Sequence, residues 1–309
     1  MSTSIVILTK NSSRTIKQCL QSCLSSNYAP LEIIIVDGGS VDNTLTLVKE
    51  TLEKFPHKIL YDEGKGLGYA RDIGWRTSNG KYILMLDSDV ILPSNFIEEA
   101  IKIMEYDNKV GSLGAKVKHV CKEKGWIPIF LEKNLAIHLH WKESTYPNEI
   151  TATPTTCTLF RRKALEEING FDHYLKFGAE DLDISFKLRK AGYKIAFLNI
   201  YAYHLETSRR FWKINFKYGR SYVHIAKKHP KQASLLTKKK VFLTLALIIL
   251  PLQIVVYLIY LFKYSKLGDL LLSEKIILPF IETIRQALRT AGMIYELYYL
   301  YFKKFHKFL

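Results

Sequence analysis

The stretch "KYILMLDSDVILPSNF", residues 81–96, decides the fold, because a buried strand ends there in two carboxylates. Tyr82 to Leu86 form an apolar run that is typical of an interior strand in a parallel sheet. Asp87 and Asp89 follow where that strand would end. In open α/β sheets, ligands bind beyond the carboxyl ends of the strands. The stretch therefore predicts a polar ligand site at one edge of a buried sheet.

Strands and helices alternate along the first part of the chain. Apolar runs predict strands at 4–8, 32–36 and 58–61, and helical patterns cover about 13–24, a stretch from Asp42 onward, and about 68–78. A series of βα units of this kind forms a parallel sheet with helices on both faces. We therefore expect an α/β fold with a mainly parallel sheet.

The positive charge is concentrated in one short segment. The 309 residues have a net charge of +16, and residues 206–240 alone carry 11 Lys and Arg against the single acid Glu206. The 22 residues that follow, Val241 to Phe262, contain no charged side chain. Such a run can cross a bilayer core of about 30 Å, and flanking basic residues mark its cytoplasmic side. We expect this charge to meet anionic membrane lipids and expect no nucleic-acid partner.

The C-terminal third is expected to associate with a membrane. Basic residues are mixed with Phe, Trp and Tyr over 204–231. Such a mixture could stack RNA bases, but the adjoining apolar run favours an interfacial amphipathic helix. Residues 276–302 resemble a second span or a helix lying in the interface. We predict a catalytic domain at 1–205, an interfacial segment at 206–240, a transmembrane helix at 241–262, and an amphipathic or second membrane helix at 263–309.

The N-terminus "MSTSIVILTKN" lacks the basic and long apolar regions of a signal peptide. The four cysteines form no CxxC pair, which fits reduced thiols. We therefore expect the catalytic domain on the cytoplasmic side of the cell membrane.

Three classes of nucleotide site compete for the D-x-D motif. A dinucleotide-binding domain needs a glycine-rich turn after its first strand, and "TKNSSRT" contains no glycine. A phosphatase of the haloacid dehalogenase type would match "ILMLDSDVI", but its motif normally lies on the first strand. In a sugar-nucleotide transferase, Asp87 and Asp89 would hold Mg²⁺ or Mn²⁺ against the leaving diphosphate. The chemistry favours the transferase.

Four motifs support that choice by their order and spacing: "SIVILTKN", "IIIVDGGSVDNT", "GLGYARDIGWRTSNGKYILMLDSDV" and "GFDHYLKFGAEDLDISFKLRKAGYKIAFL". Over about residues 3–205 the chain resembles family 2 glycosyltransferases with the GT-A fold. The resemblance implies an inverting enzyme that transfers a sugar from a UDP- or GDP-sugar with a divalent metal.

The resemblance also assigns roles to residues. It places nucleotide contacts on Thr9, Asn11, Asp37, Arg71 and Asp87, and metal contacts on Asp87, Asp89 and His204. Asp37 could instead stabilise a turn, Arg71 could be a solvated helix residue, and a lone His is often structural. Asp72 stands where the family usually has Asn.

An inverting transfer needs a carboxylate that takes the proton from the acceptor hydroxyl. A helix starting near Ala179 would carry Glu180, Asp181 and Asp183 in its first turn, where the helix dipole favours anions. The resemblance assigns the base to Asp181 and an acceptor contact to Glu180, and helix capping is the alternative for these acids.

The acceptor is expected to be lipid-linked. Arg209 and Arg210 would meet the phosphate of a polyprenyl carrier. A phosphate acceptor is already an anion and needs no base, whereas a hydroxyl does. The acidic motif therefore favours a hydroxyl of a lipid-linked glycan over the bare lipid phosphate.

Overall fold

The computed structural model describes residues 2–30, 32–133, 145–206, 208–231, 250–267 and 270–305. The chain forms two compact units. The sheet unit comprises Met1–Val120, Glu132–Lys176 and Glu180–Glu206, and the helical unit comprises Cys121–Leu131, Phe177–Ala179 and Thr207–Leu309.

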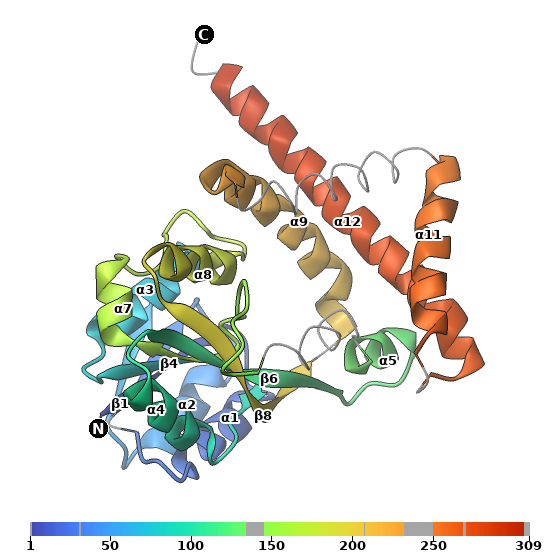
Figure 1. The fold of residues 1–309 in the computed structure, drawn as a ribbon. Coiled ribbons are helices and arrows are strands. Elements are labelled where there is room, and N and C mark those ends of the chain that lie inside the picture. The colour runs from blue at the N-terminus through green and yellow to red at the C-terminus, as the bar shows by residue number, and fades with distance from the viewer. Residues whose placement is uncertain are drawn as a thin grey trace. The chain divides into compact units, whose positions relative to one another are not determined.

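The sheet unit is built on an eight-stranded sheet with the order β3-β2-β1-β4-β7-β6-β8-β5 (Figure 1). Neighbours β3, β2, β1 and β4 pair in parallel, whereas β7 runs antiparallel to β4 and β6, and β5 to β8. The strands are β1 (Thr3–Thr9), β2 (Glu32–Asp37), β3 (His57–Tyr61), β4 (Tyr82–Asp87), β5 (Val90–Ile91), β6 (Val110–Cys121), β7 (Cys157–Arg161) and β8 (Lys194–Glu206).

The first four strands confirm the sequence prediction to within one residue at each end. The sheet as a whole is mixed, so the prediction of a mainly parallel sheet is correct only for the half formed by β3, β2, β1 and β4. The alternating pattern behind that prediction ends at Asp87 and contains no information on how the later strands pair.

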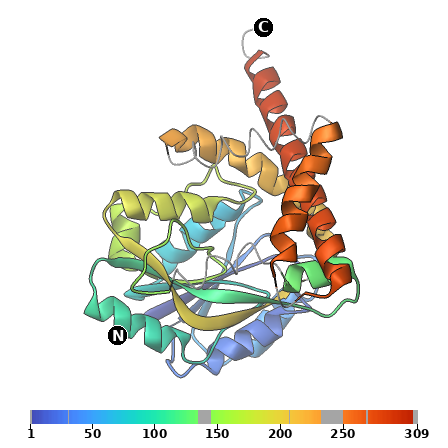
Figure 2. The same ribbon diagram turned by 45° about the vertical axis from the view of Figure 1, so that its right-hand side comes forward.

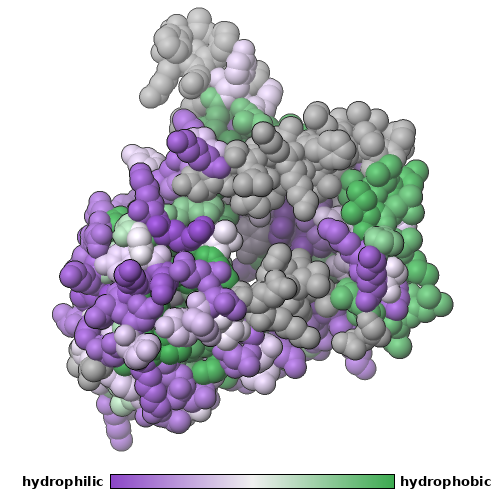
Figure 3. Space-filling model, in the orientation of Figure 1, coloured by the Kyte–Doolittle hydropathy of each residue, from purple (hydrophilic) through white to green (hydrophobic). Residues whose placement is uncertain are grey.

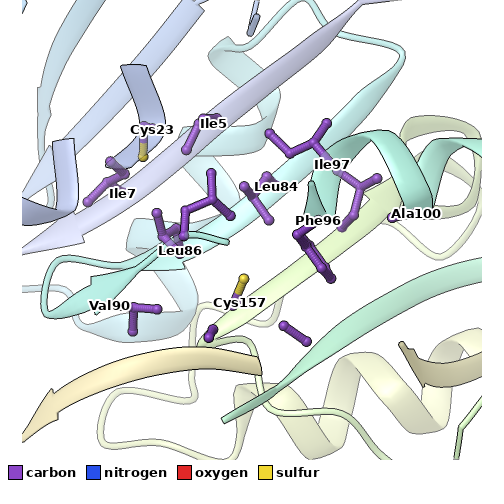
Figure 4. Packing of buried hydrophobic residues seen from close by; sticks show 14 of the residues in the cluster. Ile5, Ile7, Cys23, Leu84, Leu86, Val90, Phe96, Ile97, Ala100 and Cys157 are labelled. Carbon is purple, nitrogen blue, oxygen red and sulfur yellow. The ribbon is translucent and has the colours of Figure 1, made fainter. Parts of the chain in front are cut away.

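Helices cover both faces of the sheet. Alternate residues of each strand point to opposite faces, so strands such as β1, β2 and β4 contribute side chains to two separate cores. On one side, Ile5 and Leu84 pack with Phe96 and with helices α1 (Ile16–Leu24), α2 (Thr44–Leu52) and α4 (Phe96–Tyr106) (Figure 4). On the other side, Val6 and Met85 pack with α3 (Leu67–Thr77), α7 (Arg162–Glu167) and α8 (Glu180–Lys190). Burial on both faces explains why these strands are continuous apolar runs.

The helical unit consists of α5 (Trp126–Glu132, whose last residue falls in the sheet unit), a 3₁₀ turn (Ser208–Arg210), α9 (Phe211–Lys228), α11 (Leu250–Ser265) and α12 (Leu272–Phe305). Both α9 and α11 pack along α12 (Figure 2). A Cβ at Gly219 would lie 1.9 Å from the carbonyl oxygen of Arg289, and one at Gly292 would lie 2.0 Å from that of Phe216. The backbones of α9 and α12 therefore touch where the two glycines meet the opposite helix.

The predicted membrane segments are only partly covered by the described residues. Residues 241–249 of the expected span lie outside them, and α11 begins at Leu250 with 16 residues. Stretch 276–302 forms part of the continuous helix α12, in which Glu282 and Glu296 are buried. Among the described residues, no helix combines the length and the apolar character needed to cross a membrane.

Candidate active site

Polar residues gather at one edge of the sheet because three neighbouring parallel strands end there. Thr9 lies opposite Asp37 in the β1–β2 register, and Leu8 lies opposite Asp87 in the β1–β4 register. The D-x-D motif thus continues from β4 into a tight turn before β5. This edge is the one at which the sequence predicted a ligand.

Asp89 and His204 are brought together by the antiparallel pairing of β5 with β8, in which Val90 lies opposite His204. Asp89 Oδ1 is 3.1 Å from His204 Nε2, and the backbone oxygen of Asp89 accepts a hydrogen bond from Leu205 N at 2.7 Å. The Asp89 side chain is 41% exposed and that of His204 is 17% exposed. Both polar groups can therefore be reached from solvent.

This pair fits a divalent cation. Two neighbouring ligands at about 2.1 Å from an octahedral ion lie about 3 Å apart, close to the observed separation. A carboxylate oxygen and an imidazole nitrogen are both ligands that Mn²⁺ accepts, and carboxylates also suit Mg²⁺. No group of three or more His, Cys, Asp or Glu side chains arranged around one ion is found within the described ranges. The metal assignment of Asp87, Asp89 and His204 stays a prediction.

Arg71 connects the two acidic motifs. Its Nη2 donates to Asp87 Oδ1 at 2.9 Å and its Nε donates to Glu180 Oε1 at 3.1 Å, while Nη1 is buried without a hydrogen-bond partner in the described structure. The side chain is 4% exposed, which excludes a solvated helix residue. Burial acts to lower the pKa of Arg71, but the charges of Asp87 and Glu180 outweigh it and raise that pKa. A permanent cation at this edge of the sheet suits the negative charge of a diphosphate.

The acidic motif forms the start of α8, as predicted. Glu180 Oε1 also accepts a hydrogen bond from Thr155 at 3.4 Å, whereas Oε2 has no partner among the residues described. Asp183 is fully buried, and Asp181 is the most exposed of the three acids. Burial and the adjacent Glu180 charge raise the pKa of Asp181 to about 7. A partly buried carboxyl with this pKa suits a general base near neutral pH.

The loops after β1 and β2 are joined by hydrogen bonds. Asp37 accepts hydrogen bonds from the backbone N–H of Gly39 at 2.9 Å and of Ser40 at 2.8 Å. It therefore stabilises a turn, which was the alternative to its predicted nucleotide contact. Asn11, at φ 52°, accepts from Val41 N at 2.9 Å. Thr9 Oγ1 is buried and has no partner in the described part of the chain. The nucleotide contacts of these residues stay predictions.

Asp72 points away from the predicted diphosphate contacts. Its Oδ1 accepts from Trp75 Nε1 at 2.8 Å and from Phe171 N at 3.1 Å, and its Oδ2 pairs with Arg76 and His173. Burial acts to raise the pKa of Asp72, but these partners hold it below its ordinary value. The charge in place of the usual Asn is therefore compensated, and it ties α3 to the loop around Phe171.

Sequence reasoning missed Asp62, which directly follows β3 as Asp37 ends β2. Asp62 is 9% exposed, and its Oδ1 accepts from Gly64 N at 2.8 Å. The same rule on strand ends would have found it. It also missed Ser12 and Ser88, whose hydroxyl oxygens lie 2.8 Å apart and join the first loop to the D-x-D turn.

The arrangement on the sheet edge can be compared with known proteins. Residues 4–169, which are 166 of the 309 residues, match the family described as Glycosyl transferase family 2. The chain belongs to this family. Membership, together with the position of the D-x-D motif on the fourth strand, makes the phosphatase alternative wrong.

Two curated relatives are similar to this family 2 chain over part of their length. A poly-beta-1,6-N-acetyl-D-glucosamine synthase from Staphylococcus aureus (strain COL) is 26% identical over 190 residues, which cover 60% of this chain and 45% of that protein. Glycosyltransferase GlyA from Streptococcus pneumoniae is 27% identical over 215 residues, which cover 65% of this chain and 30% of that protein. The chain thus spans less than half the length of these relatives.

Solved structures show the fold of the family 2 chain. Mannosyltransferase PcManGT from Pyrobaculum calidifontis, in complex with GDP-Man and Mn²⁺, gives a TM-score of 0.66 at 18% identity over 96% of this chain and 86% of that one. Staphylococcus aureus TarS 1–349, in complex with UDP-GlcNAc, gives 0.56 at 20% identity over 95% and 84%. The fold is therefore an α/β GT-A-like fold with a mixed sheet.

Proposed function

We propose that this chain is an inverting glycosyltransferase that moves a sugar from a nucleotide-sugar donor to a hydroxyl of a glycan acceptor. The observation that carries the proposal is the buried Arg71, held between Asp87 and Glu180. Asp181, whose pKa is raised to about 7, directly follows Glu180. A fixed cation beside a carboxyl that can accept a proton suits the attack of a hydroxyl on a sugar diphosphate.

In this proposal, the positive charge of the buried Arg71 guanidinium stabilises the negative charge of the donor diphosphate. The carboxylates of Asp87 and Glu180 hold the guanidinium in place, so little reorganisation is needed when charge develops on the leaving group. Asp181 accepts the proton of the acceptor hydroxyl. At the same time the oxygen of that hydroxyl forms a bond to the anomeric carbon of the sugar. The bond from that carbon to the diphosphate breaks on the opposite side, which inverts the configuration and releases the nucleoside diphosphate.

Asp87, Asp89 and His204 would hold a divalent cation in this scheme. When bound, Mg²⁺ or Mn²⁺ neutralises charge on the diphosphate. The proposal is supported by the 3.1 Å separation of Asp89 and His204. It is also supported by the solved complexes of PcManGT with GDP-Man and Mn²⁺ and of GalNAc-T7 with UDP, GalNAc and Mn²⁺.

The acceptor of the proposed reaction is linked to a membrane lipid, and the sheet unit works on the cytoplasmic side. An exposed apolar face on α11 and the start of α12 supports the lipid contact (Figure 3), and Lys263 and Lys266 beside it suit anionic headgroups. The face consists of Ile254, Val255, Leu258, Ile259, Phe262, Leu271, Leu272, Ile276 and Phe280. The four free cysteines fit a reducing compartment.

The proposal is tested by titrating the protein with UDP, GDP and dTDP, with and without Mn²⁺, and by following nucleotide release from UDP-GlcNAc and GDP-mannose. We expect binding of one nucleotide that depends on Mn²⁺. Asp181→Asn keeps the size of the side chain but removes the base, so turnover should fall by about 10²–10⁴ while nucleotide affinity stays the same. Full turnover in this variant would contradict the role of Asp181.

A further inference from the structure

The backbone immediately before the proposed base has an unusual conformation. Gly178 has a φ of 127° and Ala179 has a φ of 68°, so two successive residues lie in the left-handed region. Glycine adopts this region freely, but alanine does so only at a steric cost. Glu180 and Asp181 follow directly. Contacts around the turn must therefore impose this conformation, since the local sequence does not favour it.

Helix α9 makes those contacts. Residues 177–179 belong to the helical unit, although the chain on both sides of them belongs to the sheet unit. The guanidinium of Arg220 lies over the ring of Phe177, 4.4 Å from its centre. A Cβ at Gly178 would lie 3.3 Å from ring carbons of Tyr218, so that ring lies against the backbone of the turn. Two side chains of α9 thus enclose the turn.

Arg220 is itself fixed by α12. Its Nε donates to Glu296 Oε2 at 2.6 Å, and the Glu296 side chain is 4% exposed. The centre of the Tyr295 ring lies 5.1 Å from the same guanidinium. Arg220 therefore contacts two aromatic rings, Phe177 from the turn and Tyr295 from α12. Stacking combined with a buried carboxylate partner holds the guanidinium in one orientation.

We propose that Arg220 is a positioning residue that holds the turn 177–179 through Phe177 and thereby orients Asp181 for proton transfer. The inference rests on the proposed function, in which Asp181 is the base. Loss of Arg220 should misplace the base while leaving nucleotide binding intact, because the predicted nucleotide contacts belong to the sheet unit. A displacement of about 1 Å at a reacting group lowers the rate by up to about 100-fold.

The test compares Arg220→Ala and Arg220→Lys with Arg285→Met. Arg285 is a matched control, because it is a buried arginine of the same unit whose guanidinium pairs with Glu282 and lies over the ring of Phe130. The readouts are nucleotide release from UDP-GlcNAc and GDP-mannose with Mn²⁺, and titration with UDP and GDP. For Arg220→Ala we expect kcat to fall by about 10- to 100-fold with KM and nucleotide Kd unchanged. Lysine should restore part of kcat, since it keeps the charge but lacks the planar stack.

Phe177→Leu provides a second variant that leaves the Arg220–Glu296 pair in place and should show the same loss of kcat alone. Equal losses of kcat in Arg220→Ala and Arg285→Met would overturn the inference, because they would reflect general destabilisation of the helical unit. Unchanged kcat in Arg220→Ala, or a parallel loss of nucleotide affinity, would also overturn it. If the wild type is active, Asp181→Asn is inactive and Arg220→Ala has normal activity, the inference is wrong but the proposed function stands. A wild type that releases neither nucleotide contradicts the proposed function, and the inference falls with it.

Discussion

At the scale of single residues, Asp181 should change its charge near neutral pH. Burial and the charge of Glu180 raise its pKa from 3.8 to about 7. In the unfolded chain this carboxyl ionises near 3.8, so rising pH favours unfolding between about 4 and 7. Below about pH 4 both states are protonated and the contribution vanishes. The ionising carboxyl therefore destabilises the fold progressively as pH rises from about 4 to about 7, and this loss is complete above about pH 7.

Asp181→Asn should consequently stabilise the protein at pH 8 and change little at pH 4. The gain at pH 8 is at most about 4 kcal/mol, at 1.36 kcal/mol for each of about three pKa units. Urea denaturation of both proteins at the two pH values measures it. An equal change in the free energy of unfolding at both pH values would show that the pKa of Asp181 is not raised.

Asp89→Ala should remove the dependence of nucleotide binding on Mn²⁺ and leave the fold intact. The side chain is 41% exposed at a strand end, so its loss opens no cavity in the core. Asp107→Ala is the control, since Asp107 pairs with Lys194 outside the site. Calorimetry with the preferred nucleotide, with and without Mn²⁺, measures both variants. Binding by Asp89→Ala that still depends on Mn²⁺ would move the metal to other ligands.

At the scale of elements, α3 decides where the proposed diphosphate contact lies. It carries Arg71, and it approaches β1 so closely that a Cβ at Gly74 would lie 2.4 Å from Val6 Cγ1. Asp72 ties the same helix to Phe171 and His173. The position of Arg71 on α3 thus depends on the packing of Gly74 against β1 and on the hydrogen bonds of Asp72.

Gly74→Ala should push α3 away from β1, lower the free energy of unfolding by about 1–3 kcal/mol, and weaken nucleotide binding. Thr77→Ala, at the end of the same helix and partly exposed, is the control and should be close to neutral. Urea denaturation and nucleotide titration measure the two effects. If Gly74→Ala is clearly destabilised but binds the nucleotide with normal affinity, then the position of Arg71 does not depend on how α3 packs against β1.

At the scale of the whole molecule, charge and apolar surface both concentrate in the C-terminal third. Residues 206–240 carry 11 of the 45 Lys and Arg residues. The exposed apolar face of α11 and the start of α12 lies in the following segment. Patches of this kind on a protein surface mark binding to membranes or other proteins.

The double variant Leu258→Glu and Phe262→Glu should bind less to anionic liposomes, because both side chains are more than half exposed on that face. Tyr106→Glu is the control, since Tyr106 is 88% exposed on α4 of the sheet unit. Flotation with phosphatidylserine vesicles measures the bound fraction. Equal flotation of the double variant and the wild type would exclude this face as the lipid contact.

The sequence by itself determined the elements of the parallel half and the residues at their ends. Strands buried on both faces are continuous apolar runs, so β1, β2 and β4 could be located to one residue, and Asp37 and Asp87 at the ends of β2 and β4 followed. The start of α8 was also predicted, since its three acids suit a first helical turn. These are properties of short segments, and the pattern of one segment is enough to specify them.

Only the tertiary structure decided which of these residues meet. Arg71 contacts Glu180 across 109 positions of sequence, and His204 meets Asp89 through the antiparallel pairing of β5 with β8. Asp72 accepts a hydrogen bond from Phe171 N and pairs with His173, both from a distant loop. Contacts of this kind depend on how strands close the sheet and how helices pack on it. Hydrophobic periodicity reports the burial of a segment and carries no information about its distant partners.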